Sequence, residues 1–261
     1  MATVILIPAR AGSKGVKNKN LVRIQGTSLV LRSLIHAKYI AHKEMQICIS
    51  SDSFEILAIC AKYLNIKLKK KDFKKLIYSH DKKYIFHLRP KSLAKDESLV
   101  IDLIKCLQIK ICEIGFDISN WLLLQPTSPF RSKKEMAKLR KILSDNANNQ
   151  DISLVSVKEV HEIHPARMYT RQRLGNLRPL KQFKRFYFSR RQDLPNIFIR
   201  DGGFYIIGSN LVLGSSQYSQ NPIPLIREHP WNINIDSLND LFLARGVLKS
   251  QLSEDPNTKG S

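Results

Sequence analysis

The sequence predicts an α/β fold with a Rossmann-like, mostly parallel sheet and helices on both faces. Short apolar runs alternate with segments of helical spacing throughout the first 157 residues, which is the pattern of strands joined by crossover helices. The chain has 261 residues, of which 43% are hydrophobic. It is therefore long enough to bury the core of one large domain.

The expected strands are short apolar runs bounded by turn or polar residues. They are residues 4–7, 47–49, 84–88, 121–124, 152–157, 204–207 and 231–235. The expected helices begin near residues 28, 52, 98, 132 and 237. Asp52 with Glu55, and Ser132 with Glu135, have the spacing of capping boxes, so we expect a helix to start at each.

Two basic segments interrupt the alternation. Residues 67–83 contain eight lysines without a regular period, which predicts a solvated insertion. Residues 161–195 mix arginines with aromatic residues and predict an arm. We therefore expect an α/β domain formed by residues 1–160 and 200–252, an arm of residues 161–199, and a flexible tail of residues 253–261.

The chain is strongly basic, with 43 Lys and Arg against 22 Asp and Glu and a net charge of +21. This charge favours anionic partners, which include nucleic acids and phosphorylated or carboxylated small molecules. The four cysteines lack Cys-x-x-Cys spacing, so zinc and disulfides are poorly supported. No apolar run has the roughly 18 residues of a membrane span. We expect a cytoplasmic protein that is not bound to a membrane.

The loop after the first expected strand, residues 8–20, is a candidate phosphate site, because ligands bind at the carboxyl ends of parallel strands. It supplies three cations, Arg10, Lys14 and Lys19. Gly12 and Gly15 would let backbone amides approach a phosphate closely. Neither the Walker spacing nor the dinucleotide fingerprint occurs here. A mobile basic surface loop is the alternative interpretation.

Six short stretches, read in order along the chain, have a recognisable composition. They are Leu6-Ile7-Pro8-Ala9-Arg10-Ala11-Gly12-Ser13-Lys14-Gly15 with Lys19-Asn20; Ser50-Ser51-Asp52; Arg89-Pro90 with Asp96; Leu123-Leu124-Gln125-Pro126-Thr127-Ser128-Pro129-Phe130-Arg131; and Arg191-Gln192-Asp193-Leu194-Pro195 leading to Asp201-Gly202-Gly203-Phe204-Tyr205. Asn234-Ile235-Asp236-Ser237 closes the series. Over residues 3–248 the chain resembles the CMP-sialic acid synthetase (acylneuraminate cytidylyltransferase) family, which includes CMP-legionaminic and CMP-pseudaminic acid synthetases.

This resemblance implies a nucleotide-diphospho-sugar transferase-like fold and a defined reaction. The anomeric hydroxyl of a nine-carbon acidic sugar attacks the α-phosphate of CTP, and pyrophosphate leaves. Fixed cations and Mg²⁺ would stabilise the charge that grows on the phosphate oxygens. The resemblance implies that the triphosphate and nucleotide are bound by Arg10, Ser13, Lys14, Lys19 and Asn20. It also places Arg89 beside the cytosine and Gln125 near the sugar.

Asp236 is the metal candidate, because Mg²⁺ prefers carboxylate oxygen and the residue ends an expected strand. With Arg10, Lys14 and Lys19 it completes the expected catalytic set. Asp236 or Ser237 could also cap the last helix. Many family members carry two aspartates two residues apart, whereas the first position here is Asn234. A second protein-bound metal at Asn234 is therefore doubtful.

In the family, the segment that corresponds to the basic arm forms a dimerisation arm. It brings a basic side chain into the partner's active site, where that side chain meets the sugar carboxylate. The matching regions make Arg167 and Arg191 the candidates for this contact, and a homodimer is expected. The alternative for either arginine is an exposed positive surface.

Two other functions compete with a cytidylyltransferase. A nucleic-acid-binding protein would account for the charge and for the aromatic, basic arm, but the cations are dispersed and no recognition motif is present. A nucleotidyltransferase that uses another sugar or another base is the second alternative. Sialic, legionaminic and pseudaminic acids are not distinguished by these motifs.

Overall fold

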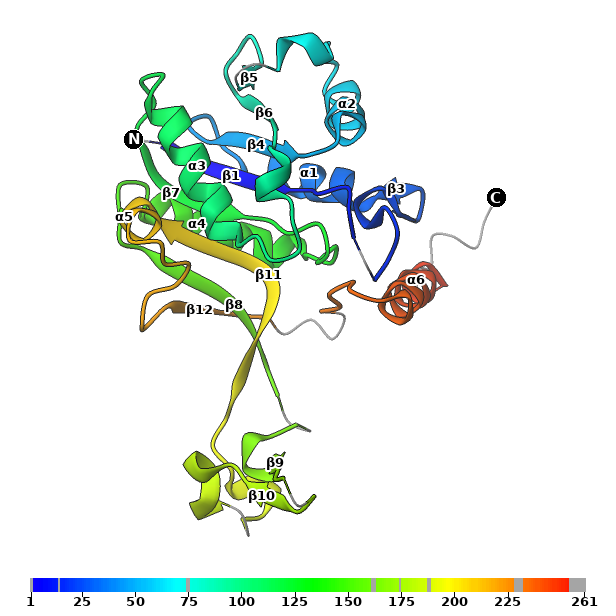
Figure 1. Cartoon of the computed structure of the whole chain (residues 1–261), viewed down its shortest axis with the longest axis vertical. Helices are drawn as coiled ribbons and strands as arrows, with labels where there is room; N and C mark the ends of the chain where they lie inside the picture. Colours follow the sequence, from blue (N-terminus) through cyan, green and yellow to red (C-terminus); the bar gives the residue numbers. More distant parts are fainter. Residues whose placement is uncertain are drawn as a thin grey trace.

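The apolar runs of the sequence form the strands of one central sheet (Figure 1). The computed structural model describes residues 2–13, 15–73, 76–160, 163–173, 175–186, 189–227 and 232–253. Within these residues the sheet has eight strands. Their order across the sheet is β12 (Ile223–Ile226), β8 (Ser153–Glu159), β11 (Phe198–Gly208), β7 (Ile118–Leu123), β1 (Ala2–Pro8), β4 (Gln46–Ser51), β6 (Tyr84–Leu88) and β5 (Ile77–Tyr78).

The sheet is mostly parallel, as expected. β7, β1, β4 and β6 run in one direction. β11 is antiparallel to both of its neighbours, and β5 is antiparallel to β6. The chain builds outward from β1 through β4 on one side, and β7 lies on the other side. The strand order thus reverses at β1, which is where ligands bind in open α/β sheets.

Helices cover both faces of the sheet. Three of them bury one face, α1 (Leu29–Ile40), α2 (Phe54–Tyr63) and α4 (Lys133–Asp145). Two cover the other face, α3 (Val100–Cys112) and α5 (Ser209–Leu213). Successive residues of β1 alternate between the two cores: Ile5 and Ile7 join the first, and Val4 and Leu6 join the second. This alternation is the period of two expected for a strand buried on both faces.

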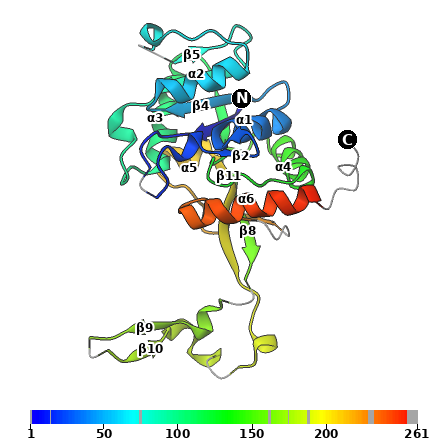
Figure 2. The ribbon, with the colours of Figure 1, turned by 90° about the vertical axis from the view of Figure 1, so that its right-hand side faces the viewer.

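The last helix, α6 (Leu238–Ser253), lies apart from these two layers (Figure 2). It buries Leu241 and Ala244 in a third cluster with Val16 and Ile24. Val16 belongs to the loop after β1, and Ile24 belongs to β2 (Arg23–Ile24), which pairs with β3 (Thr27–Ser28). α6 therefore fastens the opening loop to the edge of the domain.

An arm projects from the domain at the end of a long ribbon made by β8 and β11 (Figures 1 and 2). The arm contains the hairpin of β9 (Tyr169–Arg171) and β10 (Leu177–Pro179) and three short 3₁₀ helices, η4 (Pro165–Arg167), η5 (Lys181–Phe186) and η6 (Arg191–Asp193). Buried His164 accepts a hydrogen bond from the amide of Ala166 and bonds through Nε2 to the carbonyl of Pro195. This histidine closes the base of the arm.

The structure corrects three local expectations. α2 is capped by Ser53, whose hydroxyl accepts from the amide of Ile56, and Asp52 accepts from the amide of Ala11 instead. Of the strand expected at residues 231–235, residue 231 lies outside the described residues and residues 232–235 form no strand. The basic insertion is partly ordered, because it contains η2 (Lys70–Asp72) and β5. The Ser132–Glu135 capping box is confirmed at the start of α4.

Within the described residues, no helix is both long enough and apolar enough to span a membrane. The other expected strands and helices are present, although α5, β12 and the β2–β3 pair were not expected. The α/β fold class is confirmed.

His87 on β6 should make the protein less stable in mild acid. Burial, followed by the charges of Lys110 and Arg89, lowers the pKa of His87 from 6.5 to about 3. Protons therefore bind the unfolded chain preferentially between these values, and stability falls as the pH falls through this window. Between pH 7 and pH 5, a His87→Asn variant should lose about 2 kcal/mol less unfolding free energy than the parent.

Urea denaturation at both pH values measures this difference. The exposed His80 provides the matched control, and His80→Asn should retain the parental pH dependence. Equal losses in the parent and in His87→Asn would contradict the assignment.

Candidate active site

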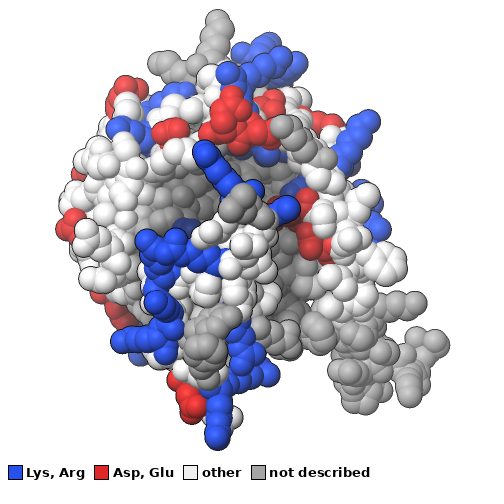
Figure 3. All heavy atoms as spheres, turned by 60° about the horizontal axis from the view of Figure 1, so that its bottom comes forward, with Lys and Arg blue, Asp and Glu red and all other residues white. Residues whose placement is uncertain are grey.

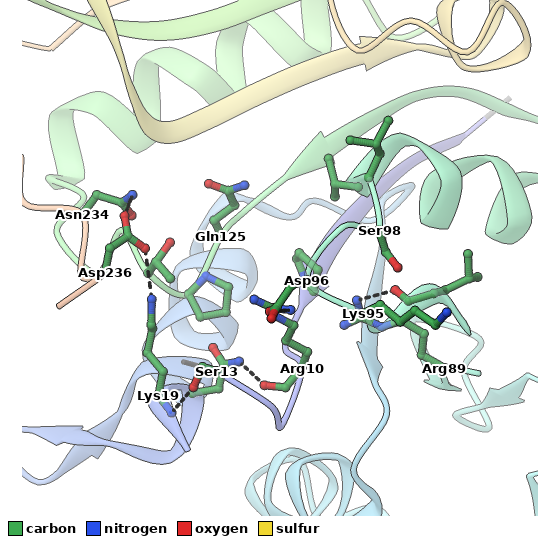
Figure 4. A pocket seen from close by; sticks show the side chains of 17 residues that line it. Arg10, Ser13, Lys19, Arg89, Lys95, Asp96, Ser98, Gln125, Asn234 and Asp236 are labelled. Atoms are coloured by element: carbon green, nitrogen blue, oxygen red, sulfur yellow. Dashed lines mark hydrogen bonds and ion pairs between the residues drawn. The ribbon is translucent and has the colours of Figure 1, made fainter. Parts of the chain in front are cut away.

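A cleft lies at the carboxyl edge of the parallel strands. The loops after β1, β6 and β7, which begin at Ala9, Arg89 and Leu124, line it together with Asn234 and Asp236. The cleft has a volume of about 360 Å³, which lies within the range of about 300–1,000 Å³ for small-molecule sites. Figure 4 shows its labelled side chains pointing toward a common space.

Most of the residues proposed from the sequence line this cleft. They are Arg10, Ser13, Lys19, Asn20, Arg89, Gln125, Asn234 and Asp236. Lys14 lies outside the described residues. Arg167 and Arg191 lie on the arm and do not line the cleft of their own chain. Folding thus brings together residues that are more than 200 positions apart in the sequence.

Polar side chains of the opening loop hold its own backbone. Asn20 is buried and donates from Nδ2 to the carbonyl of Arg10 over 2.7 Å. The Ser13 hydroxyl accepts from the amide of Lys19 over 3.1 Å, and Asp52 accepts from the amide of Ala11 over 2.8 Å. These three bonds fix the turn that presents Arg10 and Lys19 to the cleft.

Gly15 is required by packing. A Cβ at this position would overlap the carbonyl oxygen of Asp236, whereas a Cβ at Gly12 would meet no atom within 4 Å. The loop therefore lies directly against the backbone that carries the metal candidate. The sequence analysis linked both glycines to phosphate approach, and for Gly15 the close neighbour is Asp236.

The cations of the cleft are paired with acids at its rim. Arg10 contacts Asp96 at 2.6 Å, and Lys19 Nζ contacts Asp236 Oδ1 at 3.0 Å. The Lys19 side chain is 12% exposed, while that of Asp236 is 67% exposed. Exposed pairs of this kind contribute only about 0–1 kcal/mol, so an anionic ligand can displace the acidic partners at low cost.

Asp236 is held by the residues on either side of it. Asn234 Nδ2 donates to Asp236 Oδ2 over 2.7 Å, and Asn234 Oδ1 accepts from Ser128 over 3.3 Å. Ser237 and Asp240 make reciprocal bonds at the start of α6. Capping of α6 thus falls to Ser237, which leaves the Asp236 carboxylate directed into the cleft.

A metal at this edge would have few protein ligands. Within the described residues, no three His, Cys, Asp or Glu side chains form a metal-binding group. Mg²⁺ commonly uses one or two carboxylates with substrate phosphates and water, so a single exposed carboxylate fits that ion. Asn234 directs its amide nitrogen, not its oxygen, toward Asp236.

Arg89 stands at the end of β6 with its guanidinium buried. Its Nη2 donates to the carbonyl of Ser50 over 3.0 Å. Burial lowers the pKa of Arg89, Arg10 lowers it further, and Asp52 acts in the opposite direction. Nη1 donates to the carbonyl of Leu93 over 3.5 Å, and the buried Nε has no hydrogen-bond partner within the described residues. Arg89 also lines the cleft.

A buried charge network lies behind Gln125. Arg227 donates to Glu135 over 3.0 Å and to Asp201 over 2.9 Å. Arg131 donates to the carbonyls of Gln125 over 2.9 Å and Gly203 over 3.0 Å. Burial and the charge of Arg227 lower the pKa of Arg131 to about 9, so it stays charged at neutral pH. The network ties the loop after β7 to β11.

From the sequence, Glu135 was expected only in the capping box of α4, and the other three charged residues had no predicted role. Arg131 and Asp201 belong to the quoted motifs, but their spacing revealed no pairing, and Arg227 and Glu135 lie outside those motifs. A Cβ on Gly203 would overlap the Arg227 guanidinium, which gives a physical reason for glycine there. In the sequence, the adjacent glycines of Asp201-Gly202-Gly203 were the sign that another group packs closely on this backbone.

The arm carries a separate positive surface. Figure 3 shows Lys and Arg side chains gathered over the arm end of the molecule, beside a hollow in the surface. Arg167 and Arg191 are both exposed, and Arg191 lines a pocket with Glu159 and His164 at the base of the arm. A role for these arginines at a cleft would require the cleft of another protomer.

Comparisons with known proteins agree with this architecture. The chain is 26% identical to post-translational flagellin modification protein B of Campylobacter coli, over 94% of each protein. It is 25% identical to CMP-N,N'-diacetyllegionaminic acid synthase of Legionella pneumophila, over 95% of the chain and 97% of that relative. A family model described as cytidylyltransferase matches residues 4–74. The resemblance to cytidylyltransferases is confirmed.

A partial match covers less of the sequence. N-acylneuraminate cytidylyltransferase of Escherichia coli is 30% identical over 139 residues, which are 53% of this chain and 27% of that protein. Together the family model and these relatives support an enzyme of the nucleotidyltransferase type.

Solved structures support the fold. A CMP:2-keto-3-deoxy-manno-octonic acid synthetase complexed with CTP aligns with a TM-score of 0.59 at 12% identity, covering 97% of the chain and all of that structure. A 4-diphosphocytidyl-2C-methyl-D-erythritol synthase from Anaerococcus prevotii aligns with a TM-score of 0.54 at 11% identity, covering 95% of the chain and 96% of that structure. The cytidylyltransferase-like sheet is thus shared at low sequence identity.

The buried network predicts a large effect of removing Arg227. In an Arg227→Met variant, the carboxylates of Asp201 and Glu135 lose their buried cation. We expect the free energy of unfolding to fall by about 3–5 kcal/mol, because an unpaired buried charge is costly. Urea denaturation measures this loss.

The exposed Arg140 on α4 provides a matched control. Arg140→Met should change the unfolding free energy by no more than about 0.5 kcal/mol. A loss below about 1 kcal/mol in Arg227→Met would show that the network is not required for stability.

Proposed function

We propose that the protein joins a nonulosonic, sialic-type acid to CMP, using CTP and releasing pyrophosphate. The observation that carries the proposal is the convergence of Arg10, Lys19 and Arg89 with the Asp236 carboxylate in one cleft. The cleft lies at the reversal of strand order in a cytidylyltransferase-like sheet. Relatives named for CMP-legionaminic and N-acylneuraminate chemistry support the choice of acceptor class.

In this proposal the opening loop holds the triphosphate. Lys19 and Arg10 would exchange their rim acids for phosphate oxygens, while Ser13 and Asn20 keep the loop backbone in place. Lys14 belongs to the same proposed set. Because these cations are fixed before the reaction, they would stabilise the charge that develops on the phosphate oxygens and on leaving pyrophosphate.

Asp236 would hold Mg²⁺ in the loaded enzyme. A bound Mg²⁺ would neutralise phosphate charge and act as a Lewis acid. The structure favours one protein carboxylate for it, because the Asn234 amide donates its hydrogen to Asp236. Asn234 would then position Asp236 and would not be a second strong ligand.

Arg89 would bind the base. It lines the cleft just after β6, and the carbonyl and ring nitrogen of cytosine are acceptors that a guanidinium can satisfy. Gln125 lies across the cleft on the loop after β7, where it would meet the acceptor sugar. Its position is fixed by the bond from Arg131 to its carbonyl.

We further propose that the enzyme is a homodimer in which the arm reaches the partner's cleft. Arg167 and Arg191 are separate from the cleft of their own chain. The arm exposes apolar side chains as well as cations, and Ile163 and Leu177 are each 65% exposed. Such side chains suit a protein interface. An arginine delivered in this way could bind the sugar carboxylate in a bidentate manner.

A pyrophosphate-release assay tests the reaction. The protein is incubated with Mg²⁺, each of the four nucleoside triphosphates and a panel of sialic, legionaminic and pseudaminic acids. Release is expected with CTP and at least one acid. Release with a different triphosphate would indicate another nucleotidyltransferase, and its absence with every combination would refute the proposed function.

Lys19→Ala should lower kcat by about 10²–10³-fold, because one fixed cation at developing phosphate charge is lost. The melting temperature should stay close to that of the parent, since the ion pair of Lys19 within the described residues is with the exposed Asp236 carboxylate. Lys17, an exposed residue of the same loop, is the control. Parental kcat in Lys19→Ala would exclude its phosphate role.

Asn234→Asp separates the two interpretations of this position. Two neighbouring carboxylates should bind the cation more tightly, so the Mg²⁺ concentration for half-maximal rate should fall several-fold, with kcat unchanged or raised. Asn148→Asp, an exposed substitution, is the control. A large loss of kcat at saturating Mg²⁺, without unfolding, would show that the amide is required to orient Asp236.

A further inference from the structure

A recess opens beside the cleft and is continuous with it. The two share Gln125 and Asn234 as lining residues. The other walls of the recess include Arg200 and Tyr205 from β11, Tyr218 from the segment after α5, and Asn232. A molecule in the recess would therefore touch Gln125, which is where the proposed function places the acceptor sugar.

Asn232 is unusual among the residues of this recess. Its Oδ1 and its Nδ2 are both buried, and neither has a hydrogen-bond partner within the described residues. A buried polar group without a partner is costly because it has lost its water without a replacement bond, so both atoms favour a ligand that supplies one donor and one acceptor.

The chain that follows Asn232 is anchored two and three residues further on. The amide of Ile235 donates to the carbonyl of Thr127 over 2.7 Å. Asn234 Nδ2 donates to Asp236, and Asn234 Oδ1 accepts from Ser128. These bonds hold the chain on the C-terminal side of Asn232 against the loop after β7.

The facing wall is aromatic. The rings of Tyr205 and Tyr218 lie 5.9 Å apart between centroids, and the Arg200 guanidinium lies 4.5 Å from the Tyr218 ring. Gly202, at φ 75°, brings the β11 backbone close to Gln125, since a Cβ there would be 3.4 Å from Gln125 Oε1. The recess thus combines an unpaired amide with an apolar surface suited to a small alkyl group.

We propose that Asn232 determines acceptor specificity by recognising an acylamino substituent of the sugar. A secondary amide offers one N–H and one C=O, which match the carbonyl and NH₂ of the Asn232 side chain, and its acyl methyl group would pack on the tyrosines. A hydroxyl at the same carbon supplies a single polar atom and leaves part of the amide unpaired. This inference rests on the proposed function, because the acceptor is what occupies the recess.

The test compares matched acceptors. N-acetylneuraminic acid and N,N'-diacetyllegionaminic acid are each paired with analogues in which a hydroxyl replaces one acetamido group. The kcat/KM for pyrophosphate release is measured with CTP and Mg²⁺ at saturation. The parent should prefer the acylated member of at least one pair by tenfold or more, because unpaired buried amide atoms penalise the other.

Asn232→Ala should remove most of that preference while the KM for CTP stays within twofold of the parent. Asn148→Ala, the same substitution at an exposed site, should preserve the preference. Melting temperatures identify any variant that fails to fold. In that case Asn232→Asp, which replaces the NH₂ donor by an acceptor with little change in volume, gives the same readout and should also lower the preference.

Two results would overturn the inference. One is a parental preference below tenfold for every pair, and the other is a preference that persists in Asn232→Ala or Asn232→Asp. If no acceptor releases pyrophosphate, the proposed function fails separately. Titration calorimetry then measures the binding of both sugars of each pair to the parent and to Asn232→Ala. The inference requires that the parent binds the acylated sugar more tightly than its hydroxyl analogue, and that Asn232→Ala does not.

Discussion

A buried balance of charge behind the cleft is the constraint on which the site geometry depends. Arg131 and Arg227 face Glu135 and Asp201 in the interior, and both guanidinium groups lie over the ring of Phe204. Removing a charge from water costs several kcal/mol unless partners replace the hydration. Because two cations meet two anions here, α4, β11 and the loop after β7 must stay in register, and the Gln125 wall is placed as a consequence.

The opposite wall of the cleft, formed by the opening loop and Asp236, is held by apolar packing. α6 buries Leu241 against Val16 of the opening loop, and Gly15 allows that loop to touch the backbone of Asp236. The cation-bearing loop is therefore packed directly against the metal candidate. The proposed triphosphate site depends on such packing, since electrostatic stabilisation requires charges that are already in position when the reaction begins.

Sequence patterns succeeded where the determinant was local. The Ser132–Glu135 capping box forms within one helical turn, and the continuous apolar run of residues 4–7 reflects burial on both faces of the sheet. Sequence patterns failed where a residue bonds to a distant partner. Asp52 has the spacing of a cap but bonds to Ala11 across the cleft edge. Residues 232–235 are apolar enough for a strand, yet the backbone bond of Ile235 goes to the Thr127 loop instead of a sheet neighbour.

Short segments were enough to predict the fold class and the order of the motifs, and to suggest a phosphate role for the opening loop, because apolar period and residue type are local properties. Tertiary structure alone decided that Asn234 orients Asp236, that Gly15 packs on its backbone, and that the arm arginines lie away from their own cleft. It also left the Asn232 amide unpaired beside Gln125. These features depend on which distant atoms meet, and spacing along the chain does not encode that directly.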